Sequence, residues 1–533
     1  MEQFLATETL IIELLLIVSL VAIAVRRLRV PYTVALVVVG LLITFQQPVQ
    51  IDLTPELILA LFVPPLVFEA AFHIEFQRLR ENLIPILVLA IPGALLTTVI
   101  VGVIVAVGAD LSLTTALVFG ALISATDPVA VVALFRALGA PESLTVLIEG
   151  ESLFNDGTAI VVFNMMLAAA GVAAVTGGNT PASFDLGRAV INFIVVVVGG
   201  LGVGGLLGWL VARLIAQLDD YLIETTLTTV LAFGAYLIAE RLHFSGVLAV
   251  VAAGLVNGNL GPRGMSPTTR IVLFNFWEYL AFIANSLVFL LIGLDVNIPQ
   301  ITANIIPIGV AVLAVVMTRA LIVYGLTWLI NRRTPTVSRP YQHVLFWGGL
   351  RGAICLALAL SLPSTFADRE LVRVMAFGVV LFTLLGQGTT MQFLLNRLGL
   401  TRRAEEKLEF ERRHGRLMAT RAARERIEQW YREGTISELT WKQLAPELDQ
   451  QVQTQLKTQH ELLHQHPTLQ AEELADAKRE GLRAQRAALA TLLRDGVISE
   501  RTYEELLTEI DTALEQPSEL DENGTPFEDE SNE

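Results

Sequence analysis

Residues 123–156 read ISATDPVAVVALFRALGAPESLTVLIEGESLFND, two apolar segments separated by a short polar joint. Each segment is apolar enough to lie within a membrane, yet the two carry four acidic side chains: Asp127, Glu149, Glu151 and Asp156. A charge at the centre of a bilayer costs roughly 2.5–3.5 kcal/mol on insertion scales, so four carboxyl groups this close together are hard to explain as packing. We interpret the stretch as the ion site of a transporter, which the rest of the chain holds and moves.

The composition of the whole chain indicates a membrane protein. Of its 533 residues, 53% are hydrophobic and only 17% are charged, which is too apolar for a soluble protein of this size. The apolar residues fall in runs long enough to cross a bilayer as helices, and the alternation expected of outer-membrane strands is absent. The predicted class is an all-α polytopic membrane protein.

The sequence gives little support to other classes of protein. No basic run indicates nucleic acid binding, and most of the acid behind the net charge of −15 lies in the C-terminal third. The tail has no P-loop and no G-x-G-x-x-G after a strand, so no nucleotide is indicated. The single cysteine, Cys355, excludes an intrachain disulfide. We expect no enzymatic activity and no bound cofactor.

Thirteen apolar segments have the length and composition of membrane spans. Placing the N-terminus outside puts most of the arginines between these spans on the cytoplasmic side, as the positive-inside rule requires, and puts the C-terminal tail in the cytoplasm. The N-terminus is acidic where a signal peptide would be basic, so the first segment is expected to be a true span. The approximate limits are 7–26, 31–46, 54–73, 83–107, 112–135, 143–171, 186–216, 221–240, 244–260, 270–294, 304–331, 341–362 and 371–396.

Thirteen spans divide into six, one linker and six, so the second six would be inverted relative to the first. The fifth span, with Thr126-Asp127-Pro128, then corresponds to the twelfth, with Gly348-Gly349-Leu350-Arg351-Gly352. Interrupted helices at matching positions of two inverted halves indicate the binding site of a transporter. Proline and paired glycines are also ordinary in membrane helices, but here each lies beside an ionisable residue.

Asp156 is the first candidate for the ion-binding residue, because a carboxylate is a hard oxygen ligand for Na⁺, Li⁺ or H⁺. The amide of Asn155 can support it, and Ser152 lies one turn earlier on the same helix face. The alternative is a buried acid paired with a base of the twelfth span for structure alone. Thr126 is a candidate direct ligand beside the helix break, whereas Asp127 either joins the site or fixes the break electrostatically at a half-helix N-terminus.

Two arginines, Arg319 and Arg351, lie inside apolar runs and need partners. We predict that Glu151 pairs with Arg351 as a structural salt bridge, and that Glu278 pairs with Arg319. On the third span, Glu69 and His73 are one turn apart and are candidates for the entrance to the site. Glu149 receives no role.

The composition changes at residue 401, which divides the chain into a transmembrane domain (1–400), a helical tail (401–516) and an acidic, disordered end (517–533). REGTISELTW at 432–441 is echoed by RDGVISERTY at 494–503. In each copy a glycine ends one helix and a serine caps the next, which predicts two similar hairpins. The tail is either regulatory, with a partner that the sequence does not identify, or simply solvated.

These residues resemble the sodium/proton antiporters of the NhaP branch, which includes the animal Na⁺/H⁺ exchangers. The resemblance covers roughly residues 1–400 and rests on five motifs: ATDPVAVVAL (125–134), GESLFNDG (150–157), FVPPLVFE (62–69), FWEY (276–279) and GGLRGA (348–353). It implies an NhaA-like antiporter fold, a homodimer in a lipid membrane and an elevator-like movement of the bundle that holds spans 5, 6, 12 and 13.

In this family the ion-binding aspartate corresponds to Asp156, the supporting pair to Thr126 and Asp127, and the core salt bridge to Glu151 and Arg351. Asn155 stands where an electrogenic branch has aspartate, so the chain resembles the electroneutral exchangers. The resemblance implies secondary active Na⁺/H⁺ exchange in the plasma or inner membrane, with Na⁺ held by Asp156, Thr126 and Ser152, serving pH homeostasis and salt tolerance. A K⁺/H⁺ antiporter is the main alternative, followed by a cation-coupled symporter and a membrane sensor.

Overall fold

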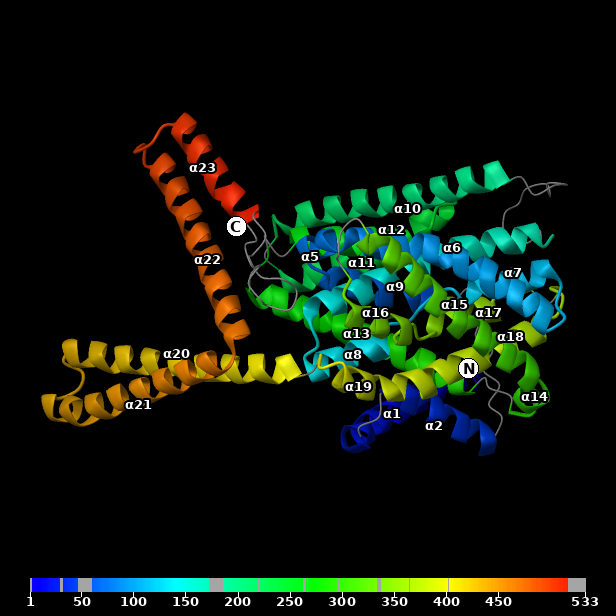
Figure 1. The fold of residues 1–533 in the computed structure, drawn as a ribbon, viewed down its shortest axis with the longest axis horizontal. Coiled ribbons are helices and arrows are strands. Elements are labelled where there is room, and N and C mark those ends of the chain that lie inside the picture. The colour runs from blue at the N-terminus through cyan, green and yellow to red at the C-terminus, as the bar shows by residue number, and fades with distance from the viewer. Residues whose placement is uncertain are drawn as a thin grey trace, which may run out of the picture. The chain divides into compact units, whose positions relative to one another are not determined.

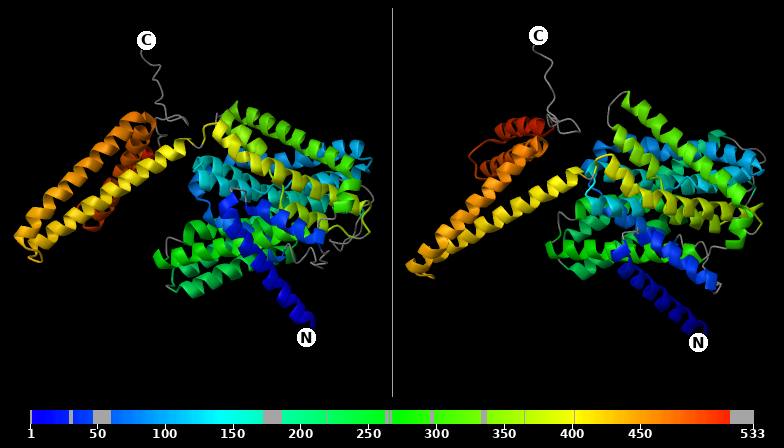
Figure 2. Two further views of the ribbon diagram at one scale, coloured as in Figure 1. Left: turned by 90° about the horizontal axis from the view of Figure 1, so that it is seen from below. Right: turned by 60° about the horizontal axis from the view of Figure 1, so that its bottom comes forward.

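The computed structural model describes residues 2–28, 32–46, 60–171, 186–218, 220–261, 265, 267–294, 298–332, 337–363, 365–400 and 402–515. Across these ranges the chain forms helices and connections without any strand (Figures 1 and 2), which confirms the all-α prediction. The chain divides into two compact units, Met1–Leu400 and Thr401–Glu533. The segment 517–533, predicted to be disordered, lies outside the described residues.

Seven helices in the described ranges are long and apolar enough to cross a membrane. They are α6 (Leu83–Gly108), α9 (Glu142–Ala169), α10 (Leu186–Ile215), α11 (Tyr221–Arg241), α13 (Pro267–Leu294), α15 (Ile305–Asn331) and the continuous run of α18 (Arg369–Phe382), η2 (Thr383–Gly388) and α19 (Thr389–Arg397). The chain is therefore polytopic, as predicted.

The remaining predicted spans coincide with helices that are shorter or only partly described. These helices are α1 (Glu2–Leu28), α2 (Tyr32–Gln46), α4 (Val63–His73) and α12 (Gly246–Leu260). Residues 54–59, the start of the third predicted span, lie outside the described residues. Thirteen crossings in inverted halves remain a prediction. The sequence did not predict two short helices, α5 (Phe76–Glu81) and α14 (Ile298–Ala303), or the π-helical turn η2.

Two of the predicted spans are interrupted, and the interruptions fall where the sequence indicated. The fifth span consists of α7 (Leu113–Leu122) and α8 (Val129–Leu138), separated by residues 123–128. Pro128, which has no amide hydrogen to continue a helix, immediately precedes α8. The twelfth span consists of α16 (Arg339–Trp347) and α17 (Ala353–Leu360), separated by the glycine-rich residues 348–352. We call these segments the first break and the second break.

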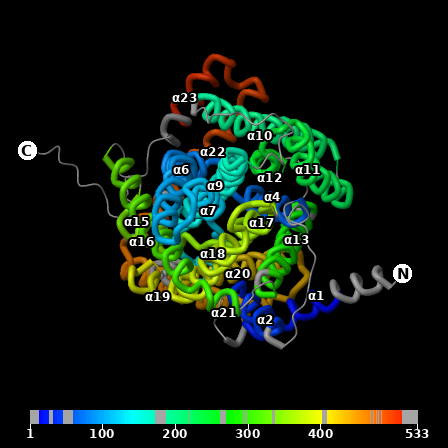
Figure 3. Tube along the Cα trace, turned by 90° about the vertical axis from the view of Figure 1, so that its right-hand side faces the viewer, coloured from blue at the N-terminus to red at the C-terminus, as the bar shows by residue number. Residues whose placement is uncertain are grey.

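The helices of the first unit form two groups (Figure 3). In one group, α6 packs against α7, α9 and α15, and α15 also packs against α18. In the other group, α12 packs against α4, α10 and α11, while α13 packs against α2 and α4. Helix α9 contacts α4, α10 and α12, so it lies where the two groups meet.

An aromatic cluster forms the centre of the second group. Trp277, from the FWEY motif, is fully buried, and its ring centroid lies 4.3 Å from that of Phe68. Its indole Nε1 donates to Thr228 Oγ1 over 3.2 Å, which satisfies the one polar atom of the side chain. The FVPPLVFE and FWEY motifs therefore hold α4 against α13.

The second unit contains two helical hairpins, as the repeat predicted. Gly434 and Gly496 adopt the left-handed φ values of 75° and 71° after the first helix of each hairpin. Ser437 Oγ accepts from Thr440 N, and Ser499 Oγ accepts from Thr502 N, each over 3.3 Å, at the start of the second helix. The hairpins pair α20 (Arg402–Arg432) with α21 (Glu438–Gln465), and α22 (Pro467–Arg494) with α23 (Glu500–Glu515).

Candidate functional site

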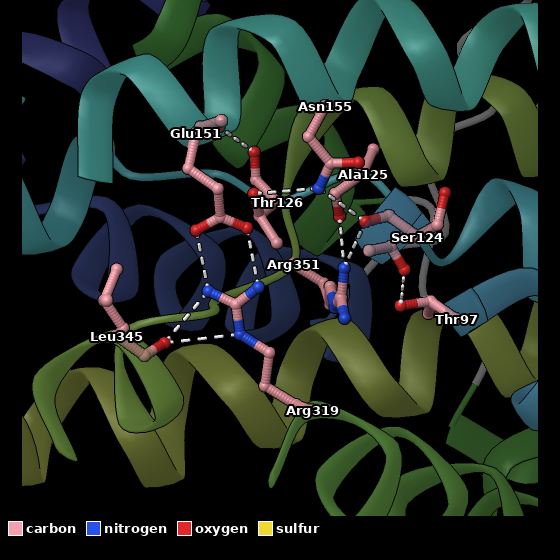
Figure 4. A network of polar contacts seen from close by, with 11 residues as sticks. Thr97, Ser124, Ala125, Thr126, Glu151, Asn155, Arg319, Leu345 and Arg351 are labelled. Atoms are coloured by element: carbon pink, nitrogen blue, oxygen red, sulfur yellow. Dashed lines mark hydrogen bonds and ion pairs between the residues drawn. The ribbon is translucent and has the colours of Figure 1, made fainter. Parts of the chain in front are cut away.

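Arg351, from the second break, holds the first break in place (Figure 4). Its Nη1 donates to the carbonyl oxygens of Ser124 and Ala125 over 2.6 and 2.9 Å, and only 1% of the residue is exposed. The end of α7 leaves carbonyl groups without helical partners, and buried carbonyl groups need other donors. The predicted pair of Arg351 with Glu151 is therefore wrong, because this guanidinium binds backbone carbonyls.

Glu151 instead pairs with Arg319 of α15 (Figure 4). Arg319 Nη1 and Nη2 lie 2.6 and 2.8 Å from the two carboxylate oxygens, and Nη2 also donates to Leu345 O over 2.9 Å. The predicted pair of Arg319 with Glu278 is also wrong, since Glu278 is exposed on α13, in the other helix group. Gly349 permits the approach, because a Cβ there would lie 2.6 Å from Arg319 Nε.

Asp127 lies at the start of two half-helices. Its Oδ1 accepts from Val129 N over 3.0 Å, in the first turn of α8. Its own amide donates to Leu350 O over 2.8 Å, which links the two breaks. Gly352 immediately precedes α17, and a Cβ there would lie 1.9 Å from Asp127 Oδ2, so only glycine fits against this carboxylate. The position favours the electrostatic role, because a negative charge is stabilised at a helix N-terminus.

Two side chains of α9 bind the first break from the other side. Asn155 Nδ2 donates to Ser124 O over 2.8 Å and to Thr126 Oγ1 over 3.2 Å (Figure 4). Ser152 Oγ donates to the carbonyl oxygen of Thr126. The amide group of Asn155 and the hydroxyl of Ser152 therefore help to fix the conformation of residues 124–126.

Asp156 faces a small inner cavity of about 70 Å³. Thr126, Asp127 and Ser152 line the same cavity, whereas Asn155 is not among its lining residues. Asp156 is 8% exposed, and its Oδ1 has no hydrogen-bond partner within the described part of the chain. Four of the five predicted ion-binding residues thus line one cavity. The fifth, Asn155, does not line it but donates to Ser124 and Thr126 of the first break.

The inner cavity offers the chemistry of a site for a small hard cation or a proton. A carboxylate, two hydroxyls and the carbonyl groups of the break are oxygen ligands, which suit Na⁺ or Li⁺ better than soft metals. No group of three or more His, Cys, Asp or Glu side chains in the described ranges is placed to hold a metal ion.

A larger outer cavity of about 630 Å³ adjoins the inner one. It is lined by Glu69, Arg136, Glu149 and Glu278, and Arg136 Nη2 lies 3.2 Å from Glu149 Oε1. Its lining includes exposed side chains, among them Arg136 and Glu278, so the cavity reaches the surface. Glu69, a candidate for the entrance to the site, lines this outer cavity. His73 is not among the lining residues and binds Glu69 through its Nδ1.

The sequence reasoning gave no role to Arg136 and Glu149. The signal was present, since Glu149 is one of the four acids of the two apolar segments within residues 123–156, and Arg136 is the one basic residue of that range. Only the fold shows that residues thirteen positions apart along the chain pair across the outer cavity.

The tail carries an H-E-x-x-H pattern that the family resemblance does not explain. His460, Glu461 and His464 lie on α21, in the spacing used by zinc peptidases. Both histidines are exposed, and the described residues supply no third side chain to complete a metal site. The H-E-x-x-H pattern therefore does not form a metal site within the described part of the chain.

Comparisons with known proteins place the chain among sodium/hydrogen exchangers. Residues 14–397 match the family described as "Sodium/hydrogen exchanger, transmembrane". The Na(+)/H(+) antiporter ApNhaP of Aphanothece halophytica is 44% identical over 401 residues, which are 75% of this chain and 75% of that protein. The low-affinity Na(+)/H(+) antiporter NhaS1 of Synechocystis is 38% identical over 92% of this chain and 93% of its own length. These relatives are transporters rather than enzymes.

The fold also resembles a solved structure. The sodium proton antiporter MjNhaP1 of Methanocaldococcus jannaschii superimposes with a TM-score of 0.63 at 21% identity, covering 75% of this chain and 99% of that one. The chain belongs to the sodium/hydrogen exchanger family.

Proposed function

We propose that this chain is a secondary active antiporter that exchanges one Na⁺ or Li⁺ for one H⁺ at Asp156. The observation that carries the proposal is a buried carboxylate that faces a small inner cavity with one oxygen unpartnered in the described chain. The names of the two relatives described above, both Na⁺/H⁺ antiporters, support the choice of ions.

Competition for one carboxylate explains why the two ions move in opposite directions. A bare charge at this depth is costly, and a proton or a cation removes that cost. Asp156 cannot hold both at once. If the site crosses only when it is neutralised, a Na⁺ carried one way must be exchanged for a H⁺ carried the other way.

One-for-one exchange also follows from how the neighbouring charges are used. Glu151 is neutralised by Arg319, and Asp127 caps a helix. Asn155, where a second carboxylate would add a charge, donates through its amide to the first break. Of Asp127, Glu151 and Asp156, Asp156 is the one left to exchange ions, which supports electroneutral transport.

Alternating access is the proposed mechanism, with the group that contains α6, α7, α9, α15 and α18 moving against the other group. The inner cavity supports this, since α4 and α13 supply part of its lining and α9 supplies Asp156. We further propose thirteen spans in a 6+1+6 inverted repeat, and a homodimer as in the resembling family.

The proposed location is the plasma or inner membrane, with the N-terminus outside and the tail in the cytoplasm. Arg136, which belongs to a predicted cytoplasmic joint, lines the outer cavity, so this cavity would open to the cytoplasm. The two hairpins of the tail are proposed to regulate transport through a partner that is not identified.

The test uses purified protein in proteoliposomes, with H⁺ flux measured after addition of Na⁺, Li⁺ or K⁺ over a range of pH. Asp156→Asn should abolish flux driven by each of these cations, because a neutral amide neither releases a proton nor offsets a cation's charge. Asp110→Asn makes the same change at an exposed site on the connection after α6 and should leave flux unchanged.

Normal exchange by a folded Asp156→Asn protein would overturn the assignment. Flux driven better by K⁺ than by Na⁺ or Li⁺ would replace Na⁺ with K⁺ as the substrate. A clear electrical current on adding Na⁺ to protein in solid-supported membranes would exclude one-for-one exchange.

A further inference from the structure

The inner and outer cavities share part of their walls. Six residues line both of them: Leu66, Ala70, Pro128, Val129, Glu149 and Asn285. We call this set the neck. A cation that passes between the surface and Asp156 through these cavities must pass the neck.

Only two side chains of the neck are polar, Glu149 and Asn285. Glu149 is 11% exposed at its side chain and is engaged by Arg136. Asn285, on α13, is 7% exposed, and its Oδ1 has no hydrogen-bond partner in the part of the chain that the structure describes. Leaving a buried polar atom unpaired costs about 1–3 kcal/mol, so this amide oxygen needs an explanation.

Packing alone does not explain the unpaired oxygen. The next residue on the same helix, Ser286, is fully satisfied, since it donates to Phe282 O over 2.5 Å and accepts from Tyr32 Oη over 2.9 Å. Helix α13 thus does provide partners for a buried polar side chain. The oxygen of Asn285 instead belongs to a residue that lines both cavities.

Asn285 and Asp156 belong to opposite helix groups. Asn285 lies on α13, which packs against α2 and α4, and Asp156 lies on α9, which packs against α6 and α7. Glu149 is also on α9. At the neck, the amide oxygen of Asn285 from one helix group therefore lies beside the path to Asp156, which belongs to the other group.

We propose that Asn285 Oδ1 and the Glu149 carboxylate form a transit site for the cation at the neck. A small cation must shed water before it enters a cavity of about 70 Å³, and protein oxygens can replace that water. The amide supplies a neutral ligand and Glu149 supplies charge. The Arg136 guanidinium competes with the cation for Glu149. This inference rests on the proposed transport of Na⁺ to Asp156.

The test compares the apparent KM for Na⁺ in proteoliposomes. Asn285→Leu keeps the approximate size of the side chain and removes the ligand oxygen, so KM should rise about tenfold, the loss of one hydrogen-bond-strength contact. Asn285→Asp keeps an oxygen in place and should retain a KM within about twofold of the starting protein. Asn275→Leu, at an exposed position of the same helix, should leave KM unchanged.

A second arm uses Arg136, whose side chain is 55% exposed and therefore tolerant of change. Arg136→Gln should lower the apparent KM for Na⁺, because it frees Glu149 for the cation. This arm gives a result even where Asn285→Leu does not fold.

An unchanged KM in folded Asn285→Leu would overturn the transit site, and so would an equal loss in Asn285→Leu and Asn285→Asp, which would indicate packing. An unchanged or raised KM in Arg136→Gln would remove Glu149 from the site. Asp156→Asn keeps the two proposals distinguishable. If that variant is inactive and Asn285→Leu is normal, the transit site fails and the antiporter assignment stands.

Discussion

The two helix breaks look alike in outline, but they use opposite chemistry. The first break, residues 123–128, contributes a carboxylate, Asp127, which lies at the start of α8 and against Gly352. The second break, residues 348–352, contributes a guanidinium, Arg351, which binds the carbonyl groups left at the end of α7. Asp127 therefore supplies the negative charge that is favoured at the start of α8. Arg351 supplies the donors that the free carbonyl groups at the end of α7 require.

The charged residues of the breaks hold the backbone in place, whereas the carboxylate proposed to carry the ion lies outside the breaks. Arg351 and Asp127 are both committed to backbone groups of the breaks, and Glu151 is committed to Arg319. Asp156, on neither break, keeps an oxygen without a partner in the described chain. The charges of Arg351 and Asp127 are thus balanced by backbone groups of the breaks. Helix α9 beside the breaks presents Asp156 as the carboxylate proposed to exchange ions.

The largest expected loss of stability comes from breaking the Glu151–Arg319 ion pair beside the second break. Glu151→Gln leaves the guanidinium of Arg319, which is 9% exposed, without a counter-charge. We expect the free energy of unfolding to fall by about 3–5 kcal/mol, measured as a lower Tm in detergent solution. Glu75→Gln, which breaks an exposed pair with Arg78, should cost less than about 1 kcal/mol.

The double variant Glu151→Gln with Arg319→Gln sharpens the assignment. It removes both charges, so it should regain part of the stability lost by Glu151→Gln alone. Additive losses in the two single variants would contradict the pairing. So would a recovery when Glu151→Gln is combined with Arg351→Gln in place of Arg319→Gln.

A smaller effect is expected where the two breaks touch. Gly352→Ala places a methyl group 1.9 Å from Asp127 Oδ2, so the carboxylate must move away from its position at the helix starts. We expect a loss of about 1–3 kcal/mol in stability, together with slower exchange. Gly325→Ala on α15 has open space around it and should not destabilise the protein. Equal stability of the two variants would show that the breaks do not pack as described.

The smallest effect is expected at Cys355, whose Sγ donates to Ala125 O over 3.1 Å. Cys355→Ala removes this weak link between α17 and the first break and should cost about 0.5–1.5 kcal/mol. Cys355→Ser keeps a donor and should lose less. The comparison fails at this point if the serine variant unfolds at a lower temperature than the alanine variant.

The sequence predicted the helices and both breaks because their signals are local. Pro128 and the glycines around Arg351 interrupt apolar runs, and such interruptions are visible without any neighbour. The capped turns of the tail, at Gly434 and Gly496, are equally local. The short helices α5 and α14 and the π-helical turn were missed because no distinct pattern of residues marks them.

The partners of the charged residues could not be predicted in the same way. The cost of an unpaired charge shows that Arg319 and Arg351 need partners, but the choice among Glu151, Glu278 and backbone carbonyls depends on which helices cross. Arg319 reaches Glu151 because α15 packs on α6 and α6 packs on α9. Asn285 had no signal at all, since one asparagine in an apolar run becomes notable only when its surroundings are known.

The central claim is that Na⁺ and H⁺ compete for Asp156, and the dependence of the apparent KM for Na⁺ on pH tests it most directly. Exchange rates would be measured in proteoliposomes at several Na⁺ concentrations, with the pH lowered stepwise on the side where Na⁺ binds. Competition at one carboxylate predicts that, once the site is mostly protonated, KM rises about tenfold for each unit of pH while the rate at saturating Na⁺ is unchanged. A KM that stays constant while the saturating rate falls would contradict the account, because H⁺ would then act at a different group.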